Sequence, residues 1–281
     1  MDRLSALLSH FSVNAGLFHS GGYCGVQVIG DAGNDGHLHF LKQGRLELWL
    51  PGQGRRVFDQ PSLLFFPRPL AHRFQATEAD GTELVCASLQ FDGGVNNPIS
   101  RALPDFLHLP LSDMPGIQPS LQLLFDEAFQ RYCGRLAVLN RLFEVLVIQI
   151  LRHLMASQSM STGLLSGLAD PQLAPVLTSM HEQPAEAWTL ERLARLAGMS
   201  RASFARHFHE RVGMTVGDYL LSWRVALAQQ KLRQGRPMKL VSGEVGYDSP
   251  SALARAFRRQ TGHSPSDWLK SHLDLTKAVP A

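Results

Sequence analysis

The spacing of apolar residues predicts a pair of short helices in the C-terminal third of the chain. Thr189 can cap the first helix, and Gly198 breaks its helical pattern. Ser200 can cap a second helix after a turn of only a few residues. In that second helix Phe204 and Phe208 stand four residues apart, so they share one side of the helix and predict a buried face. Two helices joined by so short a turn indicate a helix-turn-helix unit.

The same pattern occurs a second time, 49 residues further along the chain. The segments 204–220 and 253–269 align without a gap. Their identical positions are Ala205/Ala254, Arg206/Arg255, Phe208/Phe257, Gly213/Gly262, Asp218/Asp267 and Leu220/Leu269. Between the two copies, residues 219–232 contain neither Gly nor Pro and predict a long amphipathic helix. Such a helix could hold two recognition helices in successive major grooves of DNA, about 34 Å apart.

In the N-terminal half the pattern changes to short runs that predict β-strands. The runs cover residues 37–42, 45–50, 63–66 and 83–91, separated by turns such as those at 43–44 and 51–54. Several short strands at this spacing predict a small barrel or jelly roll. Residues 119–133 and 136–157 then carry apolar positions at helical spacing, and the small polar stretch 157–163 is the natural linker.

Charge is distributed unevenly along the chain. Residues 1–188 carry 12 Lys/Arg and 17 Asp/Glu, whereas residues 189–281 carry 15 and 7. The C-terminal part is therefore the candidate polyanion-binding region, although many basic faces are only solvated. The N-terminus lacks the pattern of a secretory signal, and the longest apolar run, residues 145–151, is too short to span a membrane. We therefore expect a cytoplasmic protein that contacts no membrane.

The C-terminal repeat resembles the AraC/XylS family of DNA-binding regulators. The resemblance covers approximately residues 171–272 and is carried by Trp223-Arg-Val-Ala-Leu-Ala-Gln-Gln-Lys-Leu232, Val245-Gly-Tyr-Asp-Ser249, Phe257-Arg-Arg-Gln-Thr-Gly262 and Ser264-Pro265. It implies that the base-reading positions are Ala202, Ser203 and Arg206 in the first unit and Pro250, Ser251 and Arg255 in the second.

Arginine can make a bidentate contact to guanine, so we expect Arg206 and Arg255 to read bases directly. We expect phosphate contacts, which position the protein without specifying sequence, at Arg201, Lys239, Arg258 and Arg259. A helical repeat that binds another protein is the alternative for this part of the chain.

The N-terminal half resembles a cupin in the order of His37-x-His39, Gly44 and His72. It departs from the usual pattern at Gln43, where cupins carry a carboxylate, and at residues 61–62, which are Pro-Ser rather than Pro-Gly-Asp. His37 and His39 are two residues apart and so point to one face of a strand. With His72 they could bind a divalent transition metal or an effector; isolated strand histidines are otherwise surface or core residues.

The three cysteines are too few and too scattered for a disulfide framework. The positions of Cys24 and Cys86 around the Leu38-His-Phe-Leu-Lys-Gln-Gly44 turn and the segment 67–73 resemble AraC-type regulators that include reactive-chlorine sensors. This resemblance implies that Cys24 and Cys86 could be oxidised by hypochlorous acid to sulfenic acid or a disulfide. Unreactive thiols are the alternative, and Cys133 has no stated role.

These patterns and resemblances together predict an α+β multidomain protein. We expect a cupin-like β-barrel that senses an effector at 1–110, a helical dimerisation segment at 111–158, a linker at 159–169 and an all-α double helix-turn-helix domain at 170–281. The expected function is that of a sequence-specific transcriptional activator rather than an enzyme. The expected partners are operator or promoter double-stranded DNA, RNA polymerase, a small-molecule or oxidant effector, and a second copy in a homodimer. No cofactor is certain, although a divalent transition metal could be bound. The alternative is a metal-dependent cupin oxygenase or isomerase that carries a DNA-binding appendage.

Overall fold

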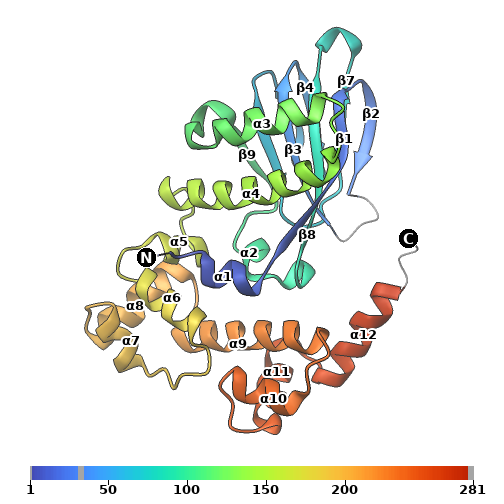
Figure 1. Cartoon of the computed structure of the whole chain (residues 1–281). Helices are drawn as coiled ribbons and strands as arrows, with labels where there is room; N and C mark the ends of the chain where they lie inside the picture. The colour runs from blue at the N-terminus through green and yellow to red at the C-terminus, as the bar shows by residue number, and fades with distance from the viewer. Residues whose placement is uncertain (1, 31–34, 278–281) are drawn as a thin grey trace. The chain divides into compact units, whose positions relative to one another are not determined.

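The chain passes twice between two structural units. A computed structural model describes residues 2–30 and 35–277. One unit, the sheet unit, consists of Phe11–Ser157; the other, the helical unit, consists of Met1–His10 together with Gln158–Ala281 (Figure 1). Within the described ranges, no helix combines the length and apolar character needed to cross a membrane.

The sheet unit is built on two antiparallel sheets. The larger sheet has the strand order β1-β8-β3-β6-β9, and the smaller has the order β2-β7-β4-β5. The strands are β1 (Val13–Gly22), β2 (Gly25–Ile29), β3 (Gly36–Gln43), β4 (Leu46–Leu50), β5 (Gly54–Phe58), β6 (Ser62–Phe66), β7 (His72–Ala76), β8 (Glu83–Phe91) and β9 (Leu107–Pro110). Side chains from both sheets, among them Leu41, Leu48, Phe74 and Cys86, are buried in one apolar core. The cupin-like architecture expected for this half is confirmed.

Two long helices of the sheet unit, α3 (Gln118–Phe129) and α4 (Arg135–Ala156), lie on the outside of the larger sheet (Figure 1). Helix α4 packs across β1, and its buried Phe143 ring lies 6.3 Å from the ring of Phe40 on β3. Because successive strand residues point to opposite faces, Phe40 meets the helices while His39 and Leu41 face the core between the sheets. The shorter elements are α2 (Pro98–Arg101) and the 3-10 turns at Glu78–Asp80, Gly94–Asn96, Leu111–Asp113 and Pro115–Ile117.

The helical unit contains the two helix-turn-helix pairs, confirming the expected C-terminal fold. Its helices are α1 (Ser5–His10), α5 (Leu164–Ala169), α6 (Ala174–Glu182), α7 (Leu190–Leu196), α8 (Arg201–Val212), α9 (Val216–Arg233), α10 (Met238–Glu244), α11 (Pro250–Thr261) and α12 (Pro265–Lys277). The side chains of Ser200 and Ser249 accept backbone hydrogen bonds at the starts of α8 and α11. Gly213 and Gly262 end these helices with φ of 83° and 77°, a conformation that favours glycine.

Two segments lie in a different unit from the one that the sequence suggests. Residues 159–169 are expected to form a linker, but their second half is α5, whose Leu165 and Leu168 are buried in the helical unit. The first ten residues are expected in the barrel, but Arg3 donates a hydrogen bond to the carbonyl of Leu168 at 2.9 Å, within the helical unit. The leucines of α5 give it an apolar face too short for periodicity to reveal, and that face is covered by α6 and α8.

Candidate nucleic-acid interface and candidate sensor site

Helices α8 and α11 carry arginines at equivalent positions, and buried residues at equivalent positions hold the two helices in place. Two fully buried residues hold each helix: Phe204 and Phe208 in α8, and Leu253 and Phe257 in α11. Arg206 and Arg255 lie on the exposed side of their helices. Neither has an ion pair or a side-chain hydrogen bond to another described residue, so both guanidinium groups can bind an external acceptor.

The other candidate base-reading residues lie at the N-terminal ends of the same helices. Ala202, Pro250 and Ser251 are exposed, and Ser203 is half-buried. The hydroxyls of Ser203 and Ser251 lie 3.0 Å from the hydroxyls of the cap residues Ser200 and Ser249, respectively. Both serines therefore have a partner within the helix terminus, and their contact with bases stays a prediction.

The four candidate phosphate-binding residues are exposed, but they differ in their surroundings. Arg201 pairs with Glu191 at 2.8 Å, and Arg259 lies 3.4 Å from Asp218. Lys239 and Arg258 have no ion pair among the described residues. Exposed ion pairs contribute only about 0–1 kcal/mol, so the two paired arginines can exchange a carboxylate for a phosphate at little cost.

The two helices differ in their charge. Helix α11 carries Arg255, Arg258 and Arg259 without an acidic residue, and these three line a shallow depression together with Ala254. Helix α8 carries Glu210 among its basic residues. The second helix therefore presents the more uniformly positive surface.

His207 of α8 is half-buried and has a partner within the helical unit. Its Nε2 lies 2.9 Å from Oδ2 of Asp170, while Oδ1 of Asp170 accepts hydrogen bonds from the backbone of Gln172 and Leu173. This contact ties α8 to the start of α6, so His207 is not a candidate for reading DNA.

In the sheet unit, the structure brings together the three histidines singled out from the sequence. Strand β3 carries His37 and His39, and β7 of the other sheet carries His72. The ring centroids of His39 and His72 lie 5.1 Å apart, and those of His37 and His72 lie 5.6 Å apart. The ring of His72 also stacks on Phe66 at 3.9 Å. We call His37, His39 and His72 the histidine cluster.

Burial keeps the histidine cluster neutral. Burial lowers the pKa of His72 to about 4 and holds that of His39 well below its usual value, where His72 and His37 add to the effect. Burial also lowers the pKa of His37. The Nδ1 atoms of His37 and His39 are buried without a hydrogen-bond partner among the described residues. Two polar nitrogens of the cluster are therefore buried without a protein partner among the described residues, which costs desolvation free energy.

The geometry of the histidine cluster is not that of a set of metal ligands. Among the described residues, no group of three or more His, Cys, Asp or Glu side chains is arranged to hold a metal ion. Glu47, on β4 of the smaller sheet, is engaged with Arg45 and Arg55. The divalent metal suggested by the cupin resemblance is therefore not supported by these residues.

The two candidate redox cysteines have opposite surroundings. Cys24 is exposed, whereas Cys86 is buried on β8, directly opposite both His19 of β1 and His39 of β3. Burial raises the pKa of the Cys86 thiol. The backbone N–H of the preceding residue, Tyr23, donates to the carbonyl of Thr82, just before β8. Thr82 lies four residues from Cys86, or about 13 Å of extended chain. Because a disulfide needs Cα atoms within about 7 Å, a direct Cys24–Cys86 bond requires a rearrangement of this segment.

His19 was missed because β1 itself was not expected. Its Nε2 is buried without a partner among the described residues, and its ring lies 5.7 Å from that of Tyr23. The strand sequence contains three glycines and no clear alternation, so only its pairing with β8 identifies it.

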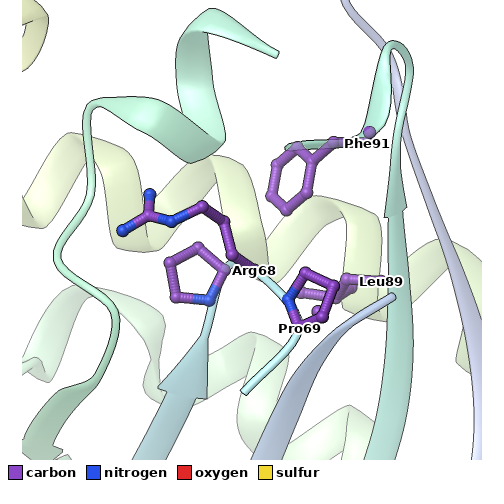
Figure 2. Close-up of a pocket in the computed structure, with 7 residues that line it drawn as sticks. Arg68, Pro69, Leu89 and Phe91 are labelled. Carbon is purple, nitrogen blue, oxygen red and sulfur yellow. The ribbon is translucent and has the colours of Figure 1, made fainter. Parts of the chain in front are cut away.

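A small pocket on the sheet unit is lined by residues other than the histidine cluster. Figure 2 shows Arg68, Pro69, Leu89 and Phe91 around it. The Arg68 guanidinium donates to the carbonyl of Leu103 at 2.9 Å and pairs with Asp105 at 2.6 Å. Arg68 is thus occupied in holding the segment around α2, and the pocket has room for no more than a water molecule.

The two halves of the chain match two family models. The cupin model matches residues 2–156, more than half of the chain, and the helix-turn-helix domain model matches residues 193–271. The fold and the two arginine-bearing helices define a class of two-part proteins that join a cupin-like unit to a helix-turn-helix unit. The chain belongs to the cupin family and carries a helix-turn-helix domain.

Several relatives are described as regulators of transcription. The chain is 36% identical over 174 residues to an HTH-type transcriptional regulator of Haemophilus influenzae, covering 62% of this chain and 58% of the relative. It is 33% identical over 200 residues to an AraC-like transcription regulator of Streptomyces antibioticus, covering 70% and 66%. It is 28% identical over 235 residues to the RCS-specific HTH-type transcriptional activator RclR of Escherichia coli, covering 82% of each. The match spans less than two thirds of the length of the first two relatives.

Proposed function

We propose that this protein is a sequence-specific transcriptional regulator that binds operator or promoter double-stranded DNA through α8 and α11. The carrying observation is the equivalent placement of Arg206 and Arg255, both exposed and without a partner among the described residues. Arg201, Lys239, Arg258 and Arg259 supply the phosphate contacts, and the N-terminal ends of the two helices supply the remaining base contacts. The names of the relatives support this function.

Selection from a random DNA library tests the proposal. The purified chain is expected to enrich one sequence, and the affinity for it should fall steeply with salt because phosphate contacts release counterions. Arg206→Ala and Arg255→Ala should each cost about 1–3 kcal/mol and relax discrimination at one position of the site. Arg101→Ala removes an exposed arginine from the sheet unit and serves as the control. The proposal would be contradicted if no sequence is enriched, or if both variants discriminate between DNA sequences as wild type does.

The sheet unit senses a small molecule or an oxidant and biases the DNA-binding state. Two observations support it: the unsatisfied nitrogens of the histidine cluster, and an exposed Cys24 with Cys86 buried beside His39. Reactivity requires an accessible thiolate, so Cys24 is the first site of attack and Cys86 follows only if the core opens. Hypochlorous acid is the oxidant to test first, by operator binding before and after brief treatment of wild type, Cys24→Ser and Cys86→Ser. Binding that is indifferent to oxidation would move the search to small polar ligands.

The regulator acts as a homodimer and as an activator that contacts RNA polymerase. The exposed apolar side chains Leu136, Val138 and Val145 of α4 are the candidate dimer surface. Sedimentation of wild type and Val145→Asp tests the dimer, and transcription in vitro with and without the enriched site tests activation. A metal-dependent oxygenase or isomerase is the less favoured alternative, since the described residues contain no ligand set for its metal.

A further inference from the structure

Arg224 lies on α9, the helix that joins the two helix-turn-helix pairs, and its side chain contacts both pairs. Nε donates to the carbonyl of Pro184 at 2.8 Å, and one terminal nitrogen donates to the carbonyl of Glu186 at 2.8 Å. Both acceptors lie in the segment between α6 and α7. The other terminal nitrogen donates to the carbonyl of Gly246 at 3.2 Å, in the turn between α10 and α11. We call residues 184–186, Arg224 and Gly246 the inter-pair seam.

Gly246 brings the backbones of the two pairs into direct contact. A Cβ atom at this position would lie 2.8 Å from the Cα of Ala185 and 2.8 Å from a terminal nitrogen of Arg224. The residue also has φ of +84°, which disfavours any side chain. Any larger residue must therefore either push the turn away from residues 184–186 or displace the guanidinium.

Both sides of the seam are fixed to a neighbouring helix, α7 on one side and α10 on the other. On one side, the Trp188 indole donates to the Gln183 carbonyl at 2.9 Å, and Arg192 of α7 pairs with Glu186 at 2.7 Å. On the other side, the backbone N–H of Tyr247 donates to the carbonyl of Ser242 at 2.8 Å. A shift at the seam would therefore move α7 and α10, and with them the recognition helices that they support.

Only arginine can make the three seam contacts at once. Its planar fork carries five N–H donors at fixed angles, whereas lysine presents a single ammonium and methionine presents no donor. Loss of the guanidinium would leave three carbonyls without this donor and would leave α9 as the main connection between the pairs.

We propose that Arg224 is a positioning residue which, with Gly246, fixes the relative placement of α8 and α11 so that the protein accepts one spacing between its two DNA sub-sites. The inference rests on the proposed function and adds to it the requirement of one fixed spacing between the two DNA sub-sites. Two rigidly joined recognition helices can bind DNA together, and so raise the overall affinity, only when the spacing of the two sub-sites matches the spacing of the helices. Loosely joined recognition helices tolerate several spacings of the sub-sites, but they bind the duplex with the best spacing more weakly. Arg224 contacts protein carbonyls rather than DNA in this scheme.

The test uses the full chain and the duplex that wild type enriches from a random library. Derived duplexes carry one, two or three extra base pairs between the sub-sites, or keep one sub-site with the other scrambled. The proteins are wild type, Arg224→Met, Gly246→Ala and the control Arg195→Met, which removes an exposed charge outside the seam. Any phosphate contact of Arg195 would weaken binding equally at every spacing.

Wild type and the control should lose about 100-fold in affinity when two base pairs are inserted. Arg224→Met and Gly246→Ala should lose about tenfold at the native spacing and less than about threefold more on insertion. Their affinity for the single sub-site should stay within about twofold of wild type.

Three results would overturn the proposal: wild type indifferent to insertion, seam variants with the spacing dependence of wild type, or equal losses on one and two sub-sites. If one seam variant fails to fold, as judged by helical circular dichroism, the other seam variant decides the test. A wild type that enriches no DNA would instead overturn the proposed function.

Discussion

The Nε2 atoms of His39 and His72 lie 3.1 Å apart, on strands from different sheets. Nδ1 of His72 lies 2.8 Å from the carbonyl oxygen of Leu70, so the proton sits on Nδ1 and the Nε2 of His72 can accept from His39. This pairing joins the two sheets through neutral rings. Protonation of both rings would set two N–H donors against each other in an apolar core.

We expect the sheet unit to lose stability as the pH falls below about 6.5. Burial lowers the pKa of His72 to about 4 in the folded state, so between these values the unfolded chain binds a proton that the folded chain excludes. The stabilisation is therefore present at neutral pH and lost as pH falls through this window. For His72 alone it amounts to roughly 3 kcal/mol.

Urea denaturation of the full chain at pH 7, 6 and 5 measures this loss. The double variant His39→Leu/His72→Phe removes two of the buried rings and should reduce the dependence on pH. His209→Leu, at an exposed position of α8, should leave it unchanged. A wild-type stability that does not change over this range would contradict the expectation.

Thiol labelling should divide the three cysteines into two fast sites and one slow site. Cys24 and Cys133 are exposed, whereas Cys86 is only 2% exposed and its pKa is raised by burial. A thiol-specific disulfide reagent attacks accessible thiolates. It should therefore modify two thiols of the native protein quickly, and the third only when the core of the sheet unit opens. Cys24→Ser and Cys133→Ser should each remove one fast equivalent, and Cys86→Ser should remove the slow one. Three fast equivalents would show that the core around Cys86 is open.

Removing the carboxylates that pair with candidate phosphate-binding arginines should strengthen DNA binding. Glu191→Gln removes the carboxylate that pairs with Arg201, and Asp218→Asn removes the carboxylate beside Arg259. Asparagine can take the place of Asp218 in the first turn of α9. Each change removes one negative charge near the interface, so we expect about a two- to fivefold gain in affinity at low salt. Fluorescence anisotropy with the enriched duplex measures it, with Glu78→Gln in the sheet unit as the control. A loss of affinity in both variants would place these arginines outside the interface.

Leu168→Ala should destabilise the helical unit by about 2–5 kcal/mol. Leu168 is fully buried on α5, and Gly167 beside it already lies against Leu177 and Val212, where a Cβ would come within 2.7 Å and 2.9 Å of their side chains. Thermal unfolding followed by helical circular dichroism measures the loss. Thr162→Ala, at an exposed position just before α5, should have little effect. Equal effects of the two substitutions would mean that α5 is a linker after all.

The sequence determined the double helix-turn-helix because its signals are local and occur twice. Ser200 and Ser249 cap, Gly213 and Gly262 terminate, and the pattern repeats without a gap, so each helix is specified within about a dozen residues. The strand content of the first half was also recognisable from short apolar runs between turns. The placement of Arg206 and Arg255 outside their helices follows from the same periodicity.

Tertiary structure alone decided which distant residues meet. Strand β1 became visible only through its pairing with β8, and that pairing puts His19 and Cys86 side by side. The pairing of His39 with His72 and the contact of Arg224 with Gly246 likewise join residues far apart in the sequence. Local periodicity records which face of an element is apolar, but it does not record what covers that face. The physical reason is that burial and partner geometry are properties of the packed chain. They set the pKa of His72, the accessibility of Cys86 and the seam between the two helix-turn-helix pairs.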